Sequence, residues 1–302
     1  MKTLEMIQVD VFTDRPLAGN PLAVFPRAQG LATEEMQAIA TEMNLSETTF
    51  VTAPRADGDA AVRIFTPETE LPFAGHPSVG TACVLVDLGL VAAVEPRTPV
   101  VLELGVGPTL VEVDVRDGEA VGATVHQGPP RFVAEVPREA AAAVLGLSVD
   151  DLHADHEPAV VGTGLDYAIV PLRDRATLGR IVLDLERVAA FEEAYAELYP
   201  CAFGDGDDPW VEARGLFPLC GILEDPATGS AAGPLAAYFA RAGVLVSGET
   251  RVVLQGAHIR RPSRLHVSVE ASGDRFADVL VGGGVATVMS GVLTLPSEPL
   301  GV

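Results

Sequence analysis

The sequence predicts an α+β protein of two pseudo-symmetric domains, each a mostly antiparallel curled sheet wrapped around a central helix. Its 302 residues are enough for two domains of ordinary size. Residues 70–91 are echoed, without a gap, by residues 224–245. A repeat seen twice indicates two similar domains rather than a solenoid. Each copy carries one helix that is apolar nearly all round, while the rest of the chain is rich in strand patterns, so we expect sheets to enclose these helices.

Four identities align the two copies: Glu70 with Glu224, Pro72 with Pro226, Gly75 with Gly229 and Gly89 with Gly243. Each copy indicates a tight loop that enters a buried helix. We expect the first glycine to adopt a backbone geometry closed to other residues and the second to form a left-handed C-terminal cap. Pro77 suits a first helical turn, whereas Pro234 lies about a turn into the second copy and predicts a later start or a bend.

Two helix N-termini, each preceded by a glycine loop, would supply backbone N–H groups for an anion. If the two ends face each other, they form a cleft for a small anion. The simpler interpretation is a pair of tight turns that serve core packing. The repeat, with His76 and Ser230 at equivalent positions after the glycine, favours function.

Composition excludes several classes of function. A net charge of −22 argues against nucleic acid and anionic membranes as partners, because both require basic patches. The sequence shows no long uncharged apolar run and no signal-peptide core, so we expect a cytoplasmic protein. Its three cysteines (Cys83, Cys201 and Cys220) lack metal-ligand spacing and are odd in number, which suits a reducing compartment.

Lysine chemistry is disfavoured because Lys2 is the only lysine. Schiff-base catalysis, pyridoxal phosphate and a nucleotide-binding P-loop all require a placed lysine. The glycine run 282–284 does not open a helix after a strand, so it is not a dinucleotide fingerprint, and no Gly-x-Ser-x-Gly elbow indicates a serine hydrolase. We expect no cofactor.

The remaining pattern predicts mainly strands. Thr33 is expected to cap a helix that ends near Asn44. In the first half we expect strands at 7–12, 22–25, 45–51, 61–66, 100–104, 109–115 and up to His126, with a turn at Asp117-Gly118. In the second half we expect strands at 131–136, 167–171, 210–217, 251–254, 264–269, 276–281 and 285–295, and helices at 138–145 and 185–198. We expect domains of residues 1–127 and 128–302, leaving open whether the last strand returns to the first domain.

Three side chains are candidates for chemistry. Glu47 enters a strand among uncharged residues, and burial in a cleft would favour its neutral form and suit it to proton transfer. Asp225 precedes the second helix end, where a carboxylate is favoured by the helix dipole alone. His76 is a candidate general acid because of its place in the repeat. Residues 150–157 gather His and carboxylates, but a solvated acidic loop explains them better than a metal site.

Several segments, in order along nearly the whole chain, resemble the PhzF-like (phenazine-biosynthesis-type) isomerases, which share the diaminopimelate epimerase fold. They are Asp10-Val11-Phe12-Thr13 with Gly19-Asn20-Pro21, Asn44-Leu45-Ser46-Glu47-Thr48-Thr49-Phe50, Arg63-Ile64-Phe65-Thr66-Pro67 leading to Gly75-His76-Pro77, and Glu224-Asp225-Pro226-Ala227-Thr228-Gly229-Ser230. The resemblance implies an active site between two domains, a homodimer, and an isomerase that needs no cofactor or metal.

In the characterised family isomerase, one glutamate moves a proton between carbons of a cyclic, unsaturated amino acid. The resemblance places this role on Glu47 and supporting catalytic roles on His76, Asp225 and Ser230. It implies that the substrate, a small carboxylated metabolite, is bound by Asn20, Gly75, Pro77, Gly229 and Ala231.

Two departures refine this expectation. Diaminopimelate epimerase uses two cysteines, and the matching positions here are Ala74 and Thr228, which disfavours two-thiol epimerisation. Many relatives have glycine at Arg260, and a bulky charge there is expected to alter the site or an interface. Epimerase or lyase chemistry in the same cleft, and a metabolite-binding protein without turnover, stay as alternatives.

Overall fold

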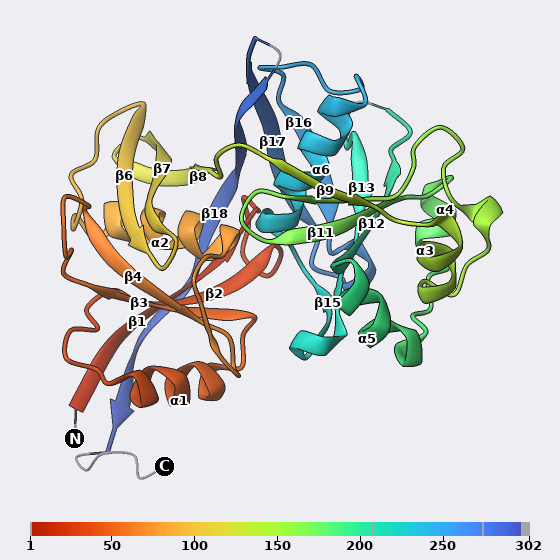
Figure 1. Ribbon diagram of the computed structural model, residues 1–302. Helices are drawn as coiled ribbons and strands as arrows, with labels where there is room; N and C mark the ends of the chain where they lie inside the picture. Colours follow the sequence, from red (N-terminus) through yellow and green to blue (C-terminus); the bar gives the residue numbers. More distant parts are fainter. Residues whose placement is uncertain (1, 207, 274, 297–302) are drawn as a thin grey trace. The chain divides into compact units, whose positions relative to one another are not determined.

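Contacts divide the chain into two compact units. The computed structural model describes residues 2–206, 208–273 and 275–296. One unit is formed by the described residues of Met1–His126 and Gly282–Val302, and the other by those of Gln127–Val281. The first unit therefore combines the two parts of the chain that flank the second (Figure 1).

The first unit contains two helices and a run of strands. The helices are α1 (Thr33–Met43) and α2 (Gly75–Asp87). The strands are β1 (Lys2–Val11), β2 (Asn20–Phe25), β3 (Glu47–Thr52), β4 (Ala60–Phe65), β5 (Glu70–Leu71), β6 (Arg97–Leu104), β7 (Gly107–Arg116), β8 (Glu119–His126) and, from Gly282 on, the end of β18 (Arg275–Leu295).

The strands of the first unit curl around α2. β18 pairs antiparallel with β1 and β1 antiparallel with β2, whereas β2 pairs parallel with β3. β3 pairs antiparallel with β4, β4 parallel with β6, and β6, β7 and β8 follow as antiparallel neighbours. β8 pairs in turn with β18, and α2 contacts strands from β1 round to β8 (Figure 1). A central helix enclosed by a curled sheet is the predicted arrangement.

Close packing of α2 depends on Gly80. A Cβ at this position would lie 2.7 Å from a Leu22 methyl group and 2.8 Å from a Val11 methyl group. The missing side chain therefore lets the helix backbone approach β1 and β2 directly. On the other face of the sheet, α1 covers an aromatic core that includes Phe25, Phe50 and Phe65.

The second unit contains more helices than the first. They are α3 (Arg138–Val144), α4 (Arg175–Leu178), α5 (Leu185–Ala194) and α6 (Gly229–Arg241), with 3-10 turns η1 (Val149–Asp151), η2 (Pro218–Cys220) and η3 (Ala257–Ile259). The strands are β9 (Arg131–Glu135), β10 (Ala159–Gly162), β11 (Asp166–Pro171), β12 (Glu197–Phe203), β13 (Val211–Ala213), β14 (Gly215–Phe217), β15 (Ile222–Asp225), β16 (Arg251–Gln255) and β17 (Ser263–Ser272), followed by the first residues of β18.

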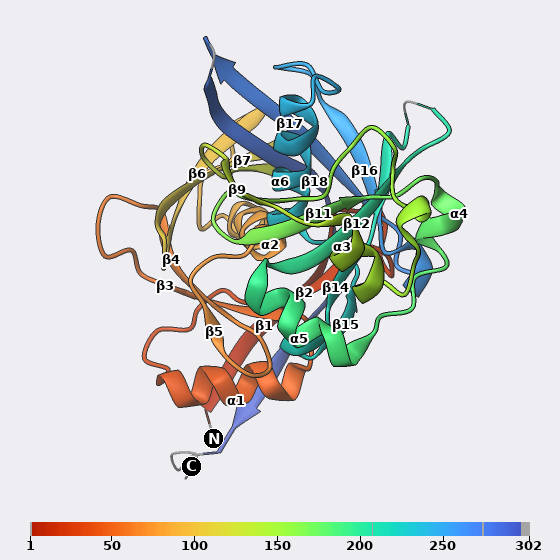
Figure 2. The ribbon, with the colours of Figure 1, turned by 45° about the vertical axis from the view of Figure 1, so that its right-hand side comes forward.

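The second unit repeats the strand pairing of the first. From β10 to β17 the neighbours are β10–β11 antiparallel, β11–β12 parallel, β12–β13 antiparallel, β13–β16 parallel and β16–β17 antiparallel. This is the order of pairings from β1 to β7 in the first unit. α2 and α6 occupy the same place, inside the second parallel crossover, and α6 contacts β10, β11 and β17 (Figure 2). The α+β class predicted from the sequence is confirmed.

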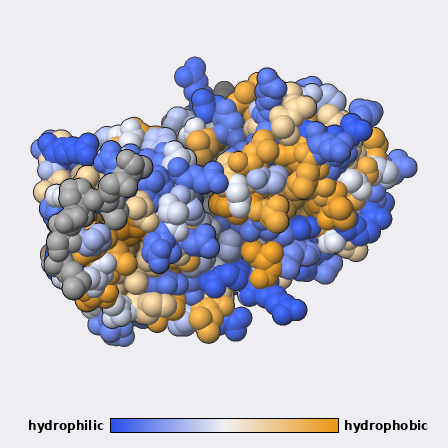
Figure 3. Space-filling view, turned by 90° about the horizontal axis from the view of Figure 1, so that it is seen from below, coloured by the Kyte–Doolittle hydropathy of each residue, from blue (hydrophilic) through white to orange (hydrophobic). Residues whose placement is uncertain are grey.

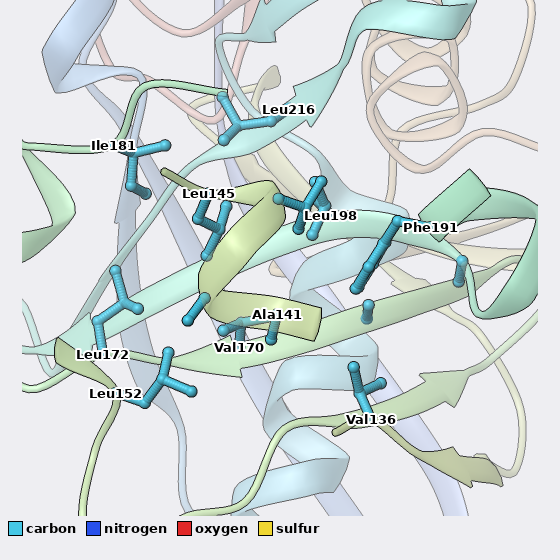
Figure 4. Packing of buried hydrophobic residues seen from close by; sticks show 14 of the residues in the cluster. Val136, Ala141, Leu145, Leu152, Val170, Leu172, Ile181, Phe191, Leu198 and Leu216 are labelled. Carbon is cyan, nitrogen blue, oxygen red and sulfur yellow. The ribbon is translucent and has the colours of Figure 1, made fainter. Parts of the chain in front are cut away.

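A separate apolar core covers the other face of the second sheet. Leu145, Val170, Phe191 and Leu198 pack together there (Figure 4). Leu145 directly follows α3, and the other three come from β11, α5 and β12 in turn. Strands covered on both faces, such as β3 and β12, are therefore buried along nearly their whole length, whereas β6, β7 and β17 alternate between buried and more exposed residues.

Two predicted element ends are wrong. Thr33 is the first helical residue of α1 rather than its cap; the N-cap is Ala32, whose N–H donates to the Glu35 carboxylate at 2.8 Å. The predicted helix at 185–198 ends at Ala194, because Glu197–Phe203 forms β12 in the middle of the sheet. The strands predicted at 276–281 and 285–295 are one continuous strand, β18.

The glycines of the repeat behave differently from one another. Gly89 and Gly243 follow the last turns of α2 and α6 with φ of 65° and 74°, so the predicted left-handed ends are confirmed. Gly75 and Gly229 are instead ordinary first residues of the helices, and the special backbone geometry predicted for them is wrong. Pro234 lies inside α6, which starts at Gly229 and not later.

Arg260 occupies a backbone conformation that favours glycine. It is exposed, closes η3 and has φ 62° and ψ 27°. Because a Cβ in the left-handed region costs about 1 kcal/mol or more, we expect Arg260→Gly to raise the free energy of unfolding by about 1 kcal/mol. Urea denaturation of the two proteins measures the change.

Arg260→Ala is the matched control for this prediction. It removes the charge and the long side chain but keeps the Cβ, so it should give little of the gain. Equal stabilities of the glycine and alanine variants would show that backbone strain at this position has no measurable effect.

The surface carries both charged and apolar residues, and the chain has a net charge of −22. On the face seen in Figure 3, hydrophobic residues reach the surface in patches among many hydrophilic ones. None of the helices in the described part of the chain combines the length and apolarity needed to cross a membrane.

Candidate active site

Glu47 is the first residue of β3 and points to the α2 side of the sheet. α1 ends at Met43, its C-cap residue Asn44 is left-handed, and the parallel pairing of β2 with β3 places Glu47 opposite Leu22. Alternate residues of a strand share a face, and Thr49, two residues on, lies with its Oγ1 2.9 Å from that of Thr81 on α2. The strand register therefore directs the carboxyl group toward the beginning of α2.

Glu47, His76 and Asn20 form a buried row in the first unit. His76 is the second residue of α2, and its Nε2 lies 3.3 Å from Glu47 Oε2. Its Nδ1 lies 3.3 Å from the Asn20 amide nitrogen at the start of β2. The side chains of His76 and Glu47 are 4% and 13% exposed, and Asn20 is fully buried. Three segments far apart in the sequence thus bring together three of the predicted site residues.

The imidazole of His76 is neutral in the folded protein. Burial lowers its pKa to about 3, from an ordinary value of 6.5. The Asn20 amide N–H donates to Nδ1, so in a neutral ring the hydrogen resides on Nε2 and faces the Glu47 carboxyl group. Although the distance satisfies the usual limit for an ion pair, this contact is therefore one between an N–H dipole and a carboxyl group.

Burial of a neutral histidine makes the protein less stable in mild acid. Because the folded pKa lies below the unfolded one, the unfolded chain binds the extra proton first, and stability falls as the pH drops below about 6.5. We expect this to cost about 2 kcal/mol between pH 7 and pH 5. Replacing His76 by glutamine should remove that part of the pH dependence, as measured by urea denaturation at the two pH values.

A histidine at the surface serves as the control. His266 is exposed on β17, so His266→Gln should change the pH dependence of unfolding much less than His76→Gln. If His76→Gln loses stability between pH 7 and pH 5 as steeply as the unmodified protein, the buried imidazole is not the group responsible.

The first turn of α2 carries the other predicted residues of this unit. Gly75 and Pro77 flank His76 in that turn, and the N-cap residue is Ala74, whose methyl group cannot accept a hydrogen bond. Ser78 turns its hydroxyl back to donate to the carbonyl of Ala74 at 2.7 Å. The N–H groups of a first helical turn, together with the helix dipole, favour a bound anion such as a carboxylate.

Asp225 and Ser230 lie in the second unit, around the start of α6. Asp225 ends β15 and is 5% exposed, and its Oδ2 accepts a 2.6 Å hydrogen bond from the Thr228 hydroxyl. The side chain of Gln255, at the end of β16, binds the same loop: its amide nitrogen donates to the Asp225 carbonyl and to Thr228 Oγ1, both at 2.9 Å. Its Oε1 accepts the N–H of Thr228 at 3.0 Å and the hydroxyl of Tyr199 at 2.7 Å.

Ser230, the second residue of α6, is the counterpart of His76 in α2. Its Oγ lies 2.8 Å from the hydroxyl of Tyr167 on β11. The predicted residues Gly229 and Ala231 flank it, and the carbonyl of Gly229 accepts a hydrogen bond from Gln127 Nε2 at 2.9 Å. The two helix starts therefore differ in chemistry, with an imidazole in one and a hydroxyl in the other.

Sequence reasoning missed the polar partners of Asp225 and Ser230. Gln255, Tyr199 and Tyr167 lie on strands that were predicted for their apolar pattern or not predicted at all. One signal was present: in Arg251–Gln255 the inward positions are Val253 and Gln255, and a buried amide at an inward strand position requires hydrogen-bond partners.

The potential metal ligands are dispersed in the described part of the chain, and two of the three cysteines, Cys83 and Cys201, are buried. The His, Cys, Asp and Glu side chains of the described residues form no group of three or more that could hold a metal ion. Asp151, in the acidic segment 150–157, accepts hydrogen bonds from Ser148 and pairs with Arg180. Burial raises the pKa of the Cys83 and Cys201 thiols, which keeps both protonated.

Comparison with known proteins gives a consistent result. Residues 9–291 match the family model described as phenazine biosynthesis-like protein. The chain is 37% identical over 285 residues to trans-2,3-dihydro-3-hydroxyanthranilate isomerase of Pseudomonas aeruginosa, an alignment that covers 94% of this chain and 97% of that one.

Solved structures place the fold in the same group. A Bacillus anthracis phenazine biosynthesis protein of the PhzF family superposes with a TM-score of 0.87 at 27% identity, covering 98% of this chain and all of that one. A probable proline racemase from Agrobacterium radiobacter shares the fold alone, with a TM-score of 0.66 at 16% identity, covering 98% of this chain and 94% of that one.

Proposed function

This chain belongs to the phenazine biosynthesis-like family and is an isomerase, and from that premise we propose that it moves a proton between two carbons of a carboxylated cyclic metabolite, with Glu47 as the single acid and base. The observation that carries the proposal is the contact of 3.3 Å between Glu47 and the neutral, buried His76. The finer mechanism is our own inference.

The neutral state of His76 is what suits Glu47 to both halves of a proton transfer. A cation beside a carboxyl group strongly favours its charged form and makes it a poor proton carrier. A neutral N–H donor stabilises the carboxylate less, so the group can accept a proton and release it again. Partial burial, with 13% of the side chain exposed, limits exchange of that proton with water.

The proposed reaction balances without another reagent. Glu47 takes a proton from one carbon, and the electron pair of the broken C–H bond passes into the conjugated double bonds of the ring. The same carboxyl group then returns the proton to a second carbon, where a new C–H bond forms as the double bonds shift. The product is an isomer of the substrate, and the enzyme is unchanged.

The other predicted residues bind and polarise the substrate in this proposal. Asn20 orients His76 against Glu47 and contributes to substrate binding, and the first turn of α2, with Gly75 and Pro77, binds the substrate carboxylate. We assign supporting roles in the same reaction to Asp225 and Ser230, with Gly229 and Ala231 binding through the start of α6. Donors at these positions match the needs of a carboxylated, hydroxylated ring.

The substrate class follows from the relatives rather than from the geometry. The Pseudomonas isomerase is named for trans-2,3-dihydro-3-hydroxyanthranilate, so a cyclic, unsaturated amino acid is our first candidate substrate. We further propose a cytoplasmic homodimer, for which sedimentation should give twice the 31.5 kDa chain mass.

Proton NMR in D2O tests the reaction type. The protein is incubated with this candidate and with related carboxylated cyclic dienes and amino acids, and deuterium entry is followed at each carbon. Isomerisation with exchange on one face supports the proposal. Exchange on both faces of one carbon would indicate an epimerase, loss of a group would indicate a lyase, and binding without change would indicate a metabolite-binding protein.

A further inference from the structure

The orientation of the Gln255 side chain is fixed by two backbone groups. The N–H of Thr228 can only donate, so it requires the amide oxygen, and the carbonyl of Asp225 can only accept, so it requires the amide nitrogen. These two bonds exclude the flipped amide. Gln255 and Tyr199 are both fully buried, so water does not compete for these groups.

This orientation sets the direction of a chain of hydrogen bonds. Tyr199 donates its only hydroxyl hydrogen to Gln255 Oε1, and Gln255 Nε2 donates to Thr228 Oγ1. Because the Thr228 oxygen already receives a hydrogen from Gln255, its own hydrogen is directed to Asp225 Oδ2, 2.6 Å away. The Asp225 oxygen at the end of the chain is therefore an acceptor, and the hydrogens all run toward it.

We propose that Gln255 is a positioning residue, which through the Thr228 hydroxyl fixes the Asp225 carboxylate in one orientation as a hydrogen-bond acceptor. The proposal rests on the function proposed above only in that Asp225 takes part in the reaction. The contacts that set the orientation of the Asp225 carboxylate lie within the second unit. Gln255 acts on Asp225 through Thr228. The chain of hydrogen bonds on which the proposal rests runs from Tyr199 to Asp225.

A purely structural role would predict something different. A buried amide that only closes the loop between β15 and α6 would affect stability and leave the ionisation of Asp225 alone. A hydroxyl that donates to a carboxylate favours its charged form, so removal of that hydroxyl makes Asp225 easier to protonate. The charge state of Asp225 therefore separates the two roles.

The test is a titration of Asp225 followed by 13C NMR in full-length protein labelled at the aspartate carboxyl carbons. The Asp225 signal is assigned by its loss in Asp225→Asn. In Thr228→Val, which keeps the shape and loses the hydroxyl, we expect the titration midpoint to rise by about one pH unit. Thr228→Ser, which keeps the hydroxyl, should restore the original midpoint.

Gln255→Glu tests the direction of the chain. It keeps the size of the side chain but has no N–H to give to Thr228, whose hydrogen is then drawn toward the new carboxylate and away from Asp225. The Asp225 midpoint should rise at least as far as in Thr228→Val. Gln255→Glu buries a charge and can fail to fold for that reason. In that case the comparison of Thr228→Val with Thr228→Ser still tests the proposal.

Thr177→Val is the matched control. Thr177 is a fully buried threonine of the same unit; its backbone N–H donates to Asp174 and its hydroxyl accepts a hydrogen bond from Arg173, and neither contact involves Asp225. Loss of the Thr177 hydroxyl should lower stability and leave the Asp225 midpoint unchanged. An unchanged midpoint in Thr228→Val, or an equal shift in Thr177→Val, would overturn the proposal.

A second test measures kcat on any substrate that the protein turns over in the NMR exchange assay. Thr228→Val should lower kcat at least about tenfold, and in an Asp225→Ala background it should have no further effect on kcat. A protein that shows the shift in midpoint but no turnover on any substrate would contradict the proposed function alone. Turnover without a shift in midpoint would contradict the positioning role alone.

Discussion

Glu47→Gln is expected to lower turnover at least about 1,000-fold while leaving the fold and ligand binding intact. Glutamine has the size of glutamate, so its amide group can occupy the place of the carboxyl group, whose oxygen lies 3.3 Å from His76 Nε2. It cannot take up a proton from carbon and return it. The rate is measured by NMR in D2O on a substrate of the wild-type protein, and binding by calorimetric titration of the same compound.

Glu42→Gln is the control for this change, because Glu42 is an exposed glutamate of α1 in the same unit. It should keep the wild-type rate. A Glu47→Gln protein that turns over and exchanges deuterium at a rate near that of the wild type would exclude Glu47 as the acid and base, and attention would pass to Asp225.

Phe50→Ala is expected to lower the free energy of unfolding of the first unit by about 4 kcal/mol. Phe50 is fully buried, and its ring stacks on Phe25 with centroids 5.1 Å apart and meets Phe65 edge-on at 5.5 Å. Alanine leaves a cavity beneath α1 that neighbouring side chains fill only in part. Urea denaturation, followed by circular dichroism, measures the loss.

Phe50→Leu retains most of the buried volume and should cost less than the alanine variant. Phe50 lies on the face of β3 opposite to that of Glu47, so a leucine that keeps the strand in place should also keep activity. A loss below about 1 kcal/mol in Phe50→Ala would show that the aromatic cluster adds little to stability.

The sequence predicts the fold wherever local pattern and tertiary environment agree. The helices at Gly75–Asp87 and Gly229–Arg241 are apolar on all sides and end in glycines, so both could be predicted from the chain alone. β12 could not be predicted in this way. Glu197–Phe203 comes directly after the helical sequence of α5, and it is a strand because it pairs with β11 and β13. β15 and β10 are four residues each, too short for any periodicity to show.

The candidate site could be predicted only in outline. The repeat singled out His76 and Ser230, and the resemblance to a family singled out Glu47, Asp225 and Asn20, but no pattern in the chain joins Asn20 to His76, 56 residues away. Contacts of that kind arise when β2 and the start of α2 meet in the folded unit. The protonation state of His76 is equally beyond the sequence, because it depends on complete burial by other segments.

The pairing of β1 with β18 has a consequence for biosynthesis. Lys2 pairs with Leu295 and Val11 with Val285, so β1 can form this pairing only after the residues of β18 have been made. All the residues of the second unit, Gln127–Val281, are made before β18 is complete. The edge of β1 that pairs with β18 therefore has no partner strand until the whole second unit has been synthesised, and the curled sheet of the first unit closes only after that.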